Sequence, residues 1–158
     1  MDDKMRRIDR QLTDEDTIRF FREAEYGVLS TVGENNMPYG VPMSFALCEN
    51  NIYFHCSIAG GKKILNIENC PNASFTVVDN TQLLPQQFAT LYMSGIAYGT
   101  IGIVKDEAEK RKGIEAILRK YSPEYIEKGM EYINQAIDKI YVLKFEIKEM
   151  TGKGRKTK

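Results

Sequence analysis

Two hydrophobic periods alternate along this chain, one typical of helices and one typical of strands. After Thr13, apolar residues follow at helical spacing. The Thr13 hydroxyl can cap a helix, and Asp16 stands three residues later, as in a capping box. Asp106 opens a second such pattern, and Ser122 followed by Pro123 opens a third. The predicted helices cover residues 14–25, a short segment at residues 62–69, and two segments that begin at residues 106 and 122.

Short runs of β-branched and aromatic residues, bounded by turn-forming residues, predict six strands. These strands cover residues 27–32, 39–47, 52–56, 73–78, 92–104 and 140–147. Residues 79–88 are predicted to form a loop, and three glycines in the fifth strand region indicate bends of a barrel. Strands joined by hairpin turns and flanked by helices favour a mainly β fold, a closed antiparallel barrel with α-helices, over a parallel sheet.

Length and charge limit the fold and the partners. With 158 residues, 42% of them hydrophobic and 28% charged, the chain is expected to form one domain over residues 1–158. Basic and acidic residues number 22 each, so net charge favours neither nucleic acid nor a membrane surface as a partner. Residues 5–10 and 152–158 are basic and are predicted to be short solvated tails, with nucleic-acid contact as the alternative.

Cysteine and histidine counts argue against a metal site and against a disulfide framework. Cys48, Cys56 and Cys70 form no C-x-x-C pair, and His55 is the single histidine. An odd number of unclustered thiols and the lack of a long apolar run predict a cytoplasmic protein with no membrane segment.

The segment Gly60-Gly61-Lys62 carries the clearest candidate chemistry. It follows a predicted strand that ends in His55-Cys56 and precedes a short predicted helix. Helix amino termini present unpaired N–H groups and a partial positive charge, which suit a phosphate, and Lys62 adds a full charge. The alternative is an ordinary glycine turn with a solvated lysine and a packed histidine, because the spacing matches neither a Walker nor a Rossmann motif.

The order of several short motifs resembles one family along about residues 5–155. The motifs are Val28-Leu29-Ser30-Thr31, Pro38-Tyr39-Gly40-Val41-Pro42, Tyr53-Phe54-His55-Cys56, Gly60-Gly61-Lys62, Ser74-Phe75-Thr76-Val77-Val78 and Thr151-Gly152-Lys153. Together they resemble the pyridoxamine 5'-phosphate oxidase-like flavin-binding split barrels, most closely the 5-nitroimidazole-resistance (Nim-like) branch. The resemblance implies a six-stranded antiparallel split β-barrel that works as a homodimer, with flavin mononucleotide (FMN) in a cleft between the two barrels.

The same resemblance implies a set of site residues. The cofactor-binding positions are Val28, Leu29, Ser30, Thr31, His55, Cys56, Gly61, Lys62 and Ser94. Gly61 and Lys62 would hold the phosphate, although relatives commonly carry a histidine or a basic residue where this chain has Gly61. The chain lacks the tryptophan and arginine cluster that ends true pyridoxamine phosphate oxidases, which argues against vitamin B6 oxidation. FAD, a deazaflavin and haem are the alternative cofactors.

The implied activity is a flavin-dependent reduction of a small electrophilic substrate such as a nitroimidazole. His55 is the predicted catalytic residue, since its unperturbed pKa near 6.5 suits proton delivery beside a flavin, and a histidine that is merely packed is the alternative. Other possibilities are a flavin-binding or redox-sensing module without turnover, and a related oxidase of another substrate. No nucleotide fingerprint identifies the electron donor.

Overall fold

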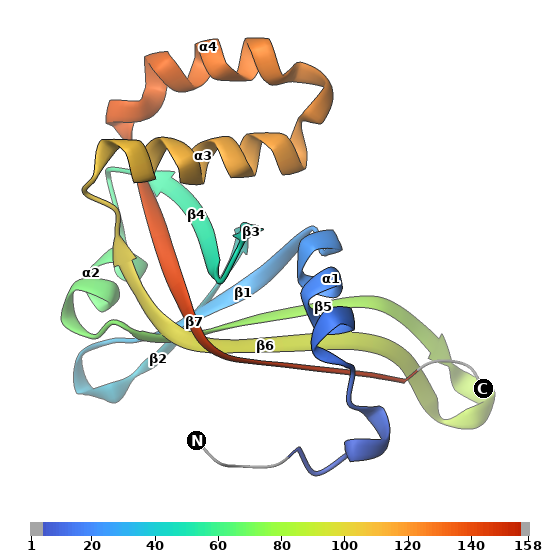
Figure 1. The fold of residues 1–158 in the computed structure, drawn as a ribbon. Helices are drawn as coiled ribbons and strands as arrows, with labels where there is room; N and C mark the ends of the chain where they lie inside the picture. The colour runs from blue at the N-terminus through green and yellow to red at the C-terminus, as the bar shows by residue number, and fades with distance from the viewer. Residues whose placement is uncertain (1–4, 156–158) are drawn as a thin grey trace.

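The computed structural model describes residues 5–155, which form one seven-stranded sheet and four α-helices (Figure 1). The strands are β1 (Tyr26–Val32), β2 (Pro38–Ser44), β3 (Ala46–Cys48), β4 (Asn51–Ser57), β5 (Asn72–Leu84), β6 (Ala89–Ile103) and β7 (Ile140–Arg155). Their order is β2-β1-β5-β6-β7-β4-β3, and all these pairings are antiparallel. The sheet curls so that β2 approaches β4 without a ladder between them, which gives a split barrel. We call this junction the seam.

Two helices begin at the predicted caps Thr13 and Asp106, whereas the helix expected to begin at residue 122 opens with a 3-10 turn and becomes α-helical only at Ile126. The α-helices are α1 (Asp14–Glu23), α2 (Lys62–Asn69), α3 (Glu107–Tyr121) and α4 (Ile126–Ala136), with short 3-10 helices at Ile8–Arg10, Glu34–Asn36, Pro85–Gln87, Pro123–Tyr125 and Ile137–Lys139. The Thr13 hydroxyl accepts the N–H of Asp16 at 3.1 Å, and the Asp106 carboxylate accepts the N–H of Glu109 at 2.8 Å. None of the helices between residues 5 and 155 has both the length and the apolar character needed to cross a bilayer.

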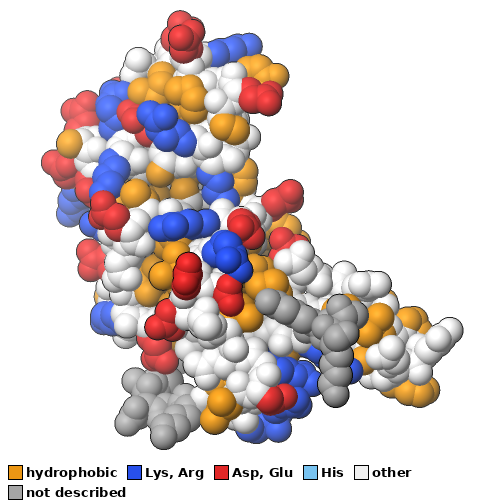
Figure 2. Space-filling model, turned by 45° about the vertical axis from the view of Figure 1, so that its right-hand side comes forward, with side chains coloured by type: hydrophobic (Ala, Val, Ile, Leu, Met, Phe, Trp, Pro, Cys, Tyr) orange, Lys and Arg blue, Asp and Glu red, His pale blue; other side chains and the backbone are white. Residues whose placement is uncertain are grey.

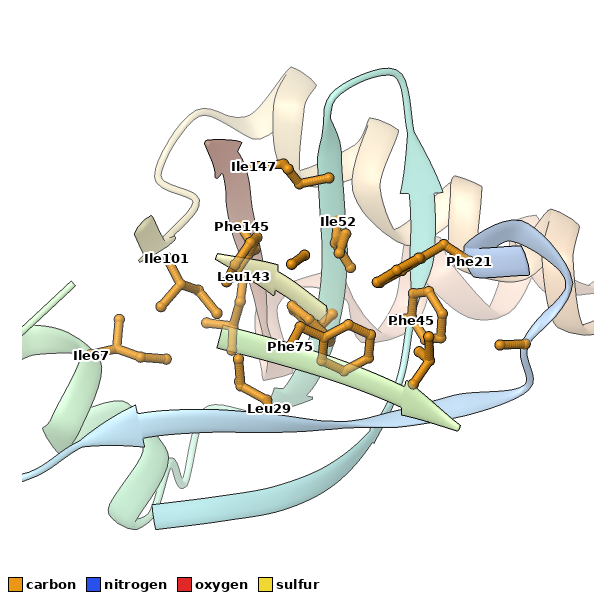
Figure 3. Close-up of a cluster of buried hydrophobic side chains, with 14 of the residues drawn as sticks. Phe21, Leu29, Phe45, Ile52, Ile67, Phe75, Ile101, Leu143, Phe145 and Ile147 are labelled. Atoms are coloured by element: carbon orange, nitrogen blue, oxygen red, sulfur yellow. The ribbon is translucent and has the colours of Figure 1, made fainter. Parts of the chain in front are cut away.

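The barrel interior is filled by aromatic and aliphatic side chains from every long strand (Figure 3). Phe75 lies at its centre, with ring centroids 4.7 Å from Phe45 and 5.0 Å from Phe54. Phe21 of α1 packs against Phe45 and Phe75 and is fully buried. Edge-to-face aromatic packing of this kind stabilises the core beyond the burial of area alone.

A second apolar cluster lies on the other side of β4. Tyr53 and Val142 pack there against isoleucines of α3 and α4, including Ile117 and Ile133. Because α3 and α4 cover β4 from outside while the barrel core lies inside, Ile52, Tyr53 and Phe54 are all fully buried. The Tyr53 hydroxyl donates to Glu109 of α3, which also pairs with Lys144 at 3.1 Å.

The last two residues of α3, Lys120 and Tyr121, bond to the backbone after α1 and to Phe45 between β2 and β3. Lys120 Nζ donates to the carbonyl of Ala24 at 2.7 Å and lies 3.6 Å from the ring centroid of Phe45. The Tyr121 hydroxyl accepts the N–H of Phe45 at 2.9 Å and contacts the carbonyl of Glu25. Burial lowers the pKa of Lys120 to about 8.

Three strand predictions need correction. The single strand expected over residues 39–47 is two strands, because Phe45 leaves the ladder to bond with Tyr121, and this raises the strand number from six to seven. The loop expected over residues 79–88 is mostly hairpin, since β5 continues to Leu84 and pairs with β6 beyond a break between Asp79 and Gln82. The last strand extends past residue 147 to Arg155, so residues 152–155 of the predicted tail belong to the sheet.

Candidate cofactor site

The turn between β4 and α2 depends on its two glycines. Gly60 and Gly61 have φ angles of +72° and +107°, in the left-handed region that favours glycine. The Gly60 N–H donates to the carbonyl of Ser57 at 3.0 Å, so the chain reverses directly after the strand. This reversal brings α2 against the end of the barrel, where Ile64 and Ile67 pack into the core.

The amino terminus of α2 is open to a ligand. Gly61 caps the helix and supplies no side-chain hydrogen bond to the first turn. A Cβ at Gly61 would have no neighbour within 4 Å, which means that the space beside this backbone is free. Lys62 is exposed, and its Nζ lies 5.4 Å from the ring centroid of Tyr39. A partial positive helix end beside a lysine is a suitable setting for an anionic group such as a phosphate.

A buried polar pair fixes α2 against β1. Asn66 Nδ2 donates to the hydroxyl oxygen of Thr31 at 3.0 Å, and the two residues are only 4% and 1% exposed. The Thr31 hydroxyl in turn donates to the carbonyl of Tyr39 at 3.5 Å. Thr31 therefore holds the helix whose amino terminus faces the open space. Sequence reasoning missed Asn66, for which the only signal is a polar residue between Ile64 and Ile67 on an apolar helix face.

The outer face of the barrel is lined by small side chains on β1, β2 and β5. Cross-strand pairing forms one row of Gly40, Ser30, Ser74, Tyr98 and Glu149, a second row of Pro42, Val28, Thr76, Ile96 and Thr151, and a third of Val78, Ser94 and Lys153. We call these three rows the outer face. Its glycine, serine and threonine positions leave room for a flat group to approach the sheet, whereas Tyr98 projects beside them.

The predicted residues of β1 divide between the two faces of the sheet. Val28 and Ser30 lie on the outer face, whereas Leu29 is fully buried in the core and Thr31 is bound to Asn66. Successive residues of a strand point to opposite sides, so only Val28 and Ser30 present side chains to the outer face. Ser94 shares that face and helps to line a pocket of about 270 Å³ together with Tyr98, Glu149 and Lys153.

His55 and Cys56 are likewise separated by strand alternation. Cys56 packs against the barrel core, and burial raises the pKa of its thiol while Lys63 opposes that shift. His55 is exposed on the opposite side of β4, beside Val142, and desolvation lowers its pKa below 6.5. The imidazole is therefore mainly neutral at pH 7. The two side chains cannot flank one group from the same side.

The remaining predicted residues lie on the strands that border the seam and at the start of α2. β2 carries Gly40 on the outer face and Tyr39 beneath Lys62, while β4 carries His55 outward two residues before its end. The structure thus places Gly61 and Lys62 at the end of the barrel that α2 closes, beside Tyr39 and one residue beyond Ser30 on β1, whereas His55 lies next to Val142 on the side of β4 that α3 and α4 cover. Ser94 lies farther along the outer face, two strands from β1 and thus about 10 Å across the sheet.

Comparison with known proteins identifies similar sequences and folds. A family model described as pyridoxamine 5'-phosphate oxidase matches residues 13–154. No curated protein matches the chain.

Several solved structures share the fold. A candidate 5-nitroimidazole antibiotic resistance protein from Bacteroides thetaiotaomicron is 23% identical with a TM-score of 0.78, over 91% of this chain and 86% of that one. The flavocytochrome Anf3 from Azotobacter vinelandii is 20% identical with a TM-score of 0.78, over 98% and 73%. An FAD-binding protein from Mesorhizobium loti is 16% identical with a TM-score of 0.68, over 94% and 97%. At these identities the likeness establishes the fold alone.

Proposed function

This chain belongs to the pyridoxamine 5'-phosphate oxidase family, and we propose that it is a flavoprotein that binds FMN and acts as an oxidoreductase. The observation that carries the proposal is the open amino terminus of α2, where Gly61 leaves free space and Lys62 supplies a charge. A phosphate at this position would meet first-turn N–H groups that no side chain caps.

The outer face supports the rest of such a ligand. A flavin ring lying along the small side chains would be flanked by Val28 and Ser30, with the phosphate at the end of the barrel. The similar structures include a flavocytochrome and an FAD-binding protein, which supports a flavin as the cofactor class. A bound flavin supplies the reducing equivalents, while the protein supplies position and electrostatics.

For the substrate, we propose a small electrophile such as a nitroimidazole. A similar fold occurs in a candidate 5-nitroimidazole antibiotic resistance protein, which supports this class. His55 is exposed two residues before the end of β4, the strand that leads into the Gly60-Gly61 turn, and is the one side chain here whose unperturbed pKa lies near neutrality. We assign it the delivery of a proton to the reduced substrate.

We also propose that the protein is a homodimer. The outer face exposes apolar side chains, with Val28 37%, Tyr98 42% and Val78 57% accessible. A single barrel of this size has its interior filled by aromatic residues, so a bound flavin needs a second surface to cover it.

Spectroscopy of the purified protein tests the cofactor. Absorption bands at about 370 and 450 nm identify an oxidised flavin, and mass spectrometry of the released cofactor separates FMN from FAD. Lys62→Ala should weaken flavin binding at least about tenfold, since it removes a charge-assisted contact to the phosphate. Lys128→Ala, an exposed lysine on α4, is the matched control and should bind flavin as the unmodified protein does. A colourless protein that takes up no FMN, or equal affinity in both variants, would refute this assignment.

A further inference from the structure

The hairpin between β5 and β6 projects beyond the rest of the sheet. β1 pairs only with residues 73–76 of β5, whereas β5 and β6 pair with each other as far as Leu84 and Ala89. We call residues 79–91 the arm. Figure 1 shows the arm at the end of the molecule opposite α2. A two-stranded ribbon of this kind is marginally stable in water unless another surface packs against it.

The arm exposes large hydrophobic side chains and carries little charge. Phe88 is 99% exposed and Leu83 is 71% exposed, and Figure 2 shows hydrophobic side chains on this projection. Phe88 also has a φ angle of +48°, which is unusual for a bulky residue. Asp79 is the only charged residue of the arm, so the arm has no basic side chains to attract lipid headgroups or nucleic acid.

Charges on the outer face indicate a second copy of the chain as the surface that covers the arm. Glu149 and Lys153 stand in the first and third rows of that face, and within the described residues neither forms an ion pair. If two copies pack with their outer faces together and the two-fold axis runs along the middle row, the strands of the partner run in the opposite direction. Lys153 would then meet the partner's Glu149, and the same contact would form twice because a two-fold interface is isologous.

The same symmetry directs the arm toward the partner's cofactor site. On β5, Leu84 near the tip of the arm lies eight residues beyond Thr76 of the middle row, which corresponds to about 26 Å along the strand. From Val28 in the middle row to the end of β1 at Val32 is four residues, or about 13 Å. The reversed arm is therefore long enough to pass the end of β1 and reach the region of α2.

We propose that the arm of each protomer clasps the other protomer and places Phe88 over the partner's cofactor site, where it excludes water from the flavin. This inference rests on the proposed flavin-binding dimer and adds the residue that completes the site from the second copy. An exposed, strained aromatic at the tip of a neutral ribbon becomes buried in this arrangement.

Two sets of variants test the clasp on the full-length, flavin-loaded protein. Phe88→Ser should weaken dimerisation at least about tenfold and increase quenching of flavin fluorescence by iodide, whereas Tyr132→Ser, 71% exposed on α4, should change neither. Lys153→Glu and Glu149→Lys should each weaken the dimer about tenfold, and the double variant should return to within about threefold of the unmodified protein. Sedimentation equilibrium measures the dimer dissociation constant.

The outcomes separate this inference from the function on which it rests. An unmodified protein that stays monomeric overturns the clasp and the proposed homodimer, while flavin bound to that monomer would still support the cofactor assignment. If the protein is a dimer without flavin, the cofactor assignment fails, and the Lys153→Glu and Glu149→Lys variants still test the geometry of the dimer. If it is a flavin-loaded dimer and Phe88→Ser matches Tyr132→Ser in both measurements, or the double charge variant dimerises as weakly as the single ones, the clasp alone is wrong.

Discussion

The two outward sides of this barrel differ although they belong to one sheet. Beside β4 and the start of β7, large side chains such as Tyr53 and Val142 are fully buried under α3 and α4. The outer face instead carries Ser30, Ser74 and Thr76, while α1 and α2 pack on the opposite side of the sheet, at Gly95 and Thr31. The covered side is built for stability, whereas the uncovered side keeps small and hydroxyl-bearing residues that a packed core would not need. We therefore expect the ligand-binding surface on the outer face, which the helices leave uncovered.

The largest expected effect is a contrast in stability between the two sides. Ile117→Ala on α3 removes side-chain atoms from the covered cluster, where Ile117 is 6% exposed, and should lower the free energy of unfolding by about 2–5 kcal/mol. Val28→Ala on the outer face should change it by no more than about 0.5 kcal/mol in the monomer. Urea denaturation at a concentration below the dimer dissociation constant measures both. Similar losses in the two variants would remove the distinction.

His55 lies on β4 in line with Tyr53, and its exposure sets it apart from the covered cluster. His55→Ala should lower turnover about 10²-fold or more while flavin binding remains, because general acid catalysis typically contributes that much. Since desolvation lowers the pKa of His55, its protonated form becomes the major form only at a pH below 6.5. Turnover of the unmodified protein should rise as the pH falls into that range, and the variant should lose this dependence.

A packing role for His55 would give the opposite pattern. In that case His55→Ala would keep full turnover and its pH profile, and the variant would unfold at a lower temperature. Steady-state rates and thermal unfolding, measured on the same preparations, separate the two roles.

The smallest expected effect is a pH dependence of the free energy of unfolding that arises from Lys120, where α3 meets the end of α1. Folding lowers the pKa of Lys120 from its ordinary 10.5 to about 8 because burial disfavours the charged amine. Between these values the unfolded chain binds more protons, so this residue makes the protein more stable as the pH rises from 8 to 10.5. Relative to Lys120→Met, the unmodified protein should therefore gain stability across that range.

The exposed Lys128 provides the matched control for this comparison. Lys128→Met should leave the slope of unfolding free energy against pH unchanged. A Lys120→Met variant with the same slope as the unmodified protein would show that the amine titrates alike in the folded and unfolded chains.

Local features of the fold follow from the sequence because their causes lie within a few residues. The Thr13 and Asp106 caps, the two-residue alternation of β1 and the glycine turn before α2 are of this kind. Features that depend on contacts between residues far apart in the chain could not be predicted from the sequence. Tyr121 interrupts the strand at Phe45 from 76 residues away, and Asn66 engages Thr31 across 35 residues.

The site shows the same limit. The turn at Gly61 could be located from its glycines, whereas the faces of the predicted residues could not be assigned without the register. Pairing places Val28 and Ser30 outside, with Leu29 and Cys56 against the core. The polar stretch at residues 79–88 gives no strand signal because its pairing depends on the hairpin that it forms with β6.

The seam also determines where the barrel can fluctuate. β2 is hydrogen-bonded only to β1, and β3 adds three residues to the edge of β4, so neither terminal strand is held on both sides. In hydrogen-exchange terms, amides of β2 belong to a unit that opens without unfolding β5, β6 and β7, because only one ladder must break. The seam thus offers a low-cost opening at the end of the barrel where α2 presents its amino terminus, and a ligand bound there would slow amide exchange in β2 more than in the central strands.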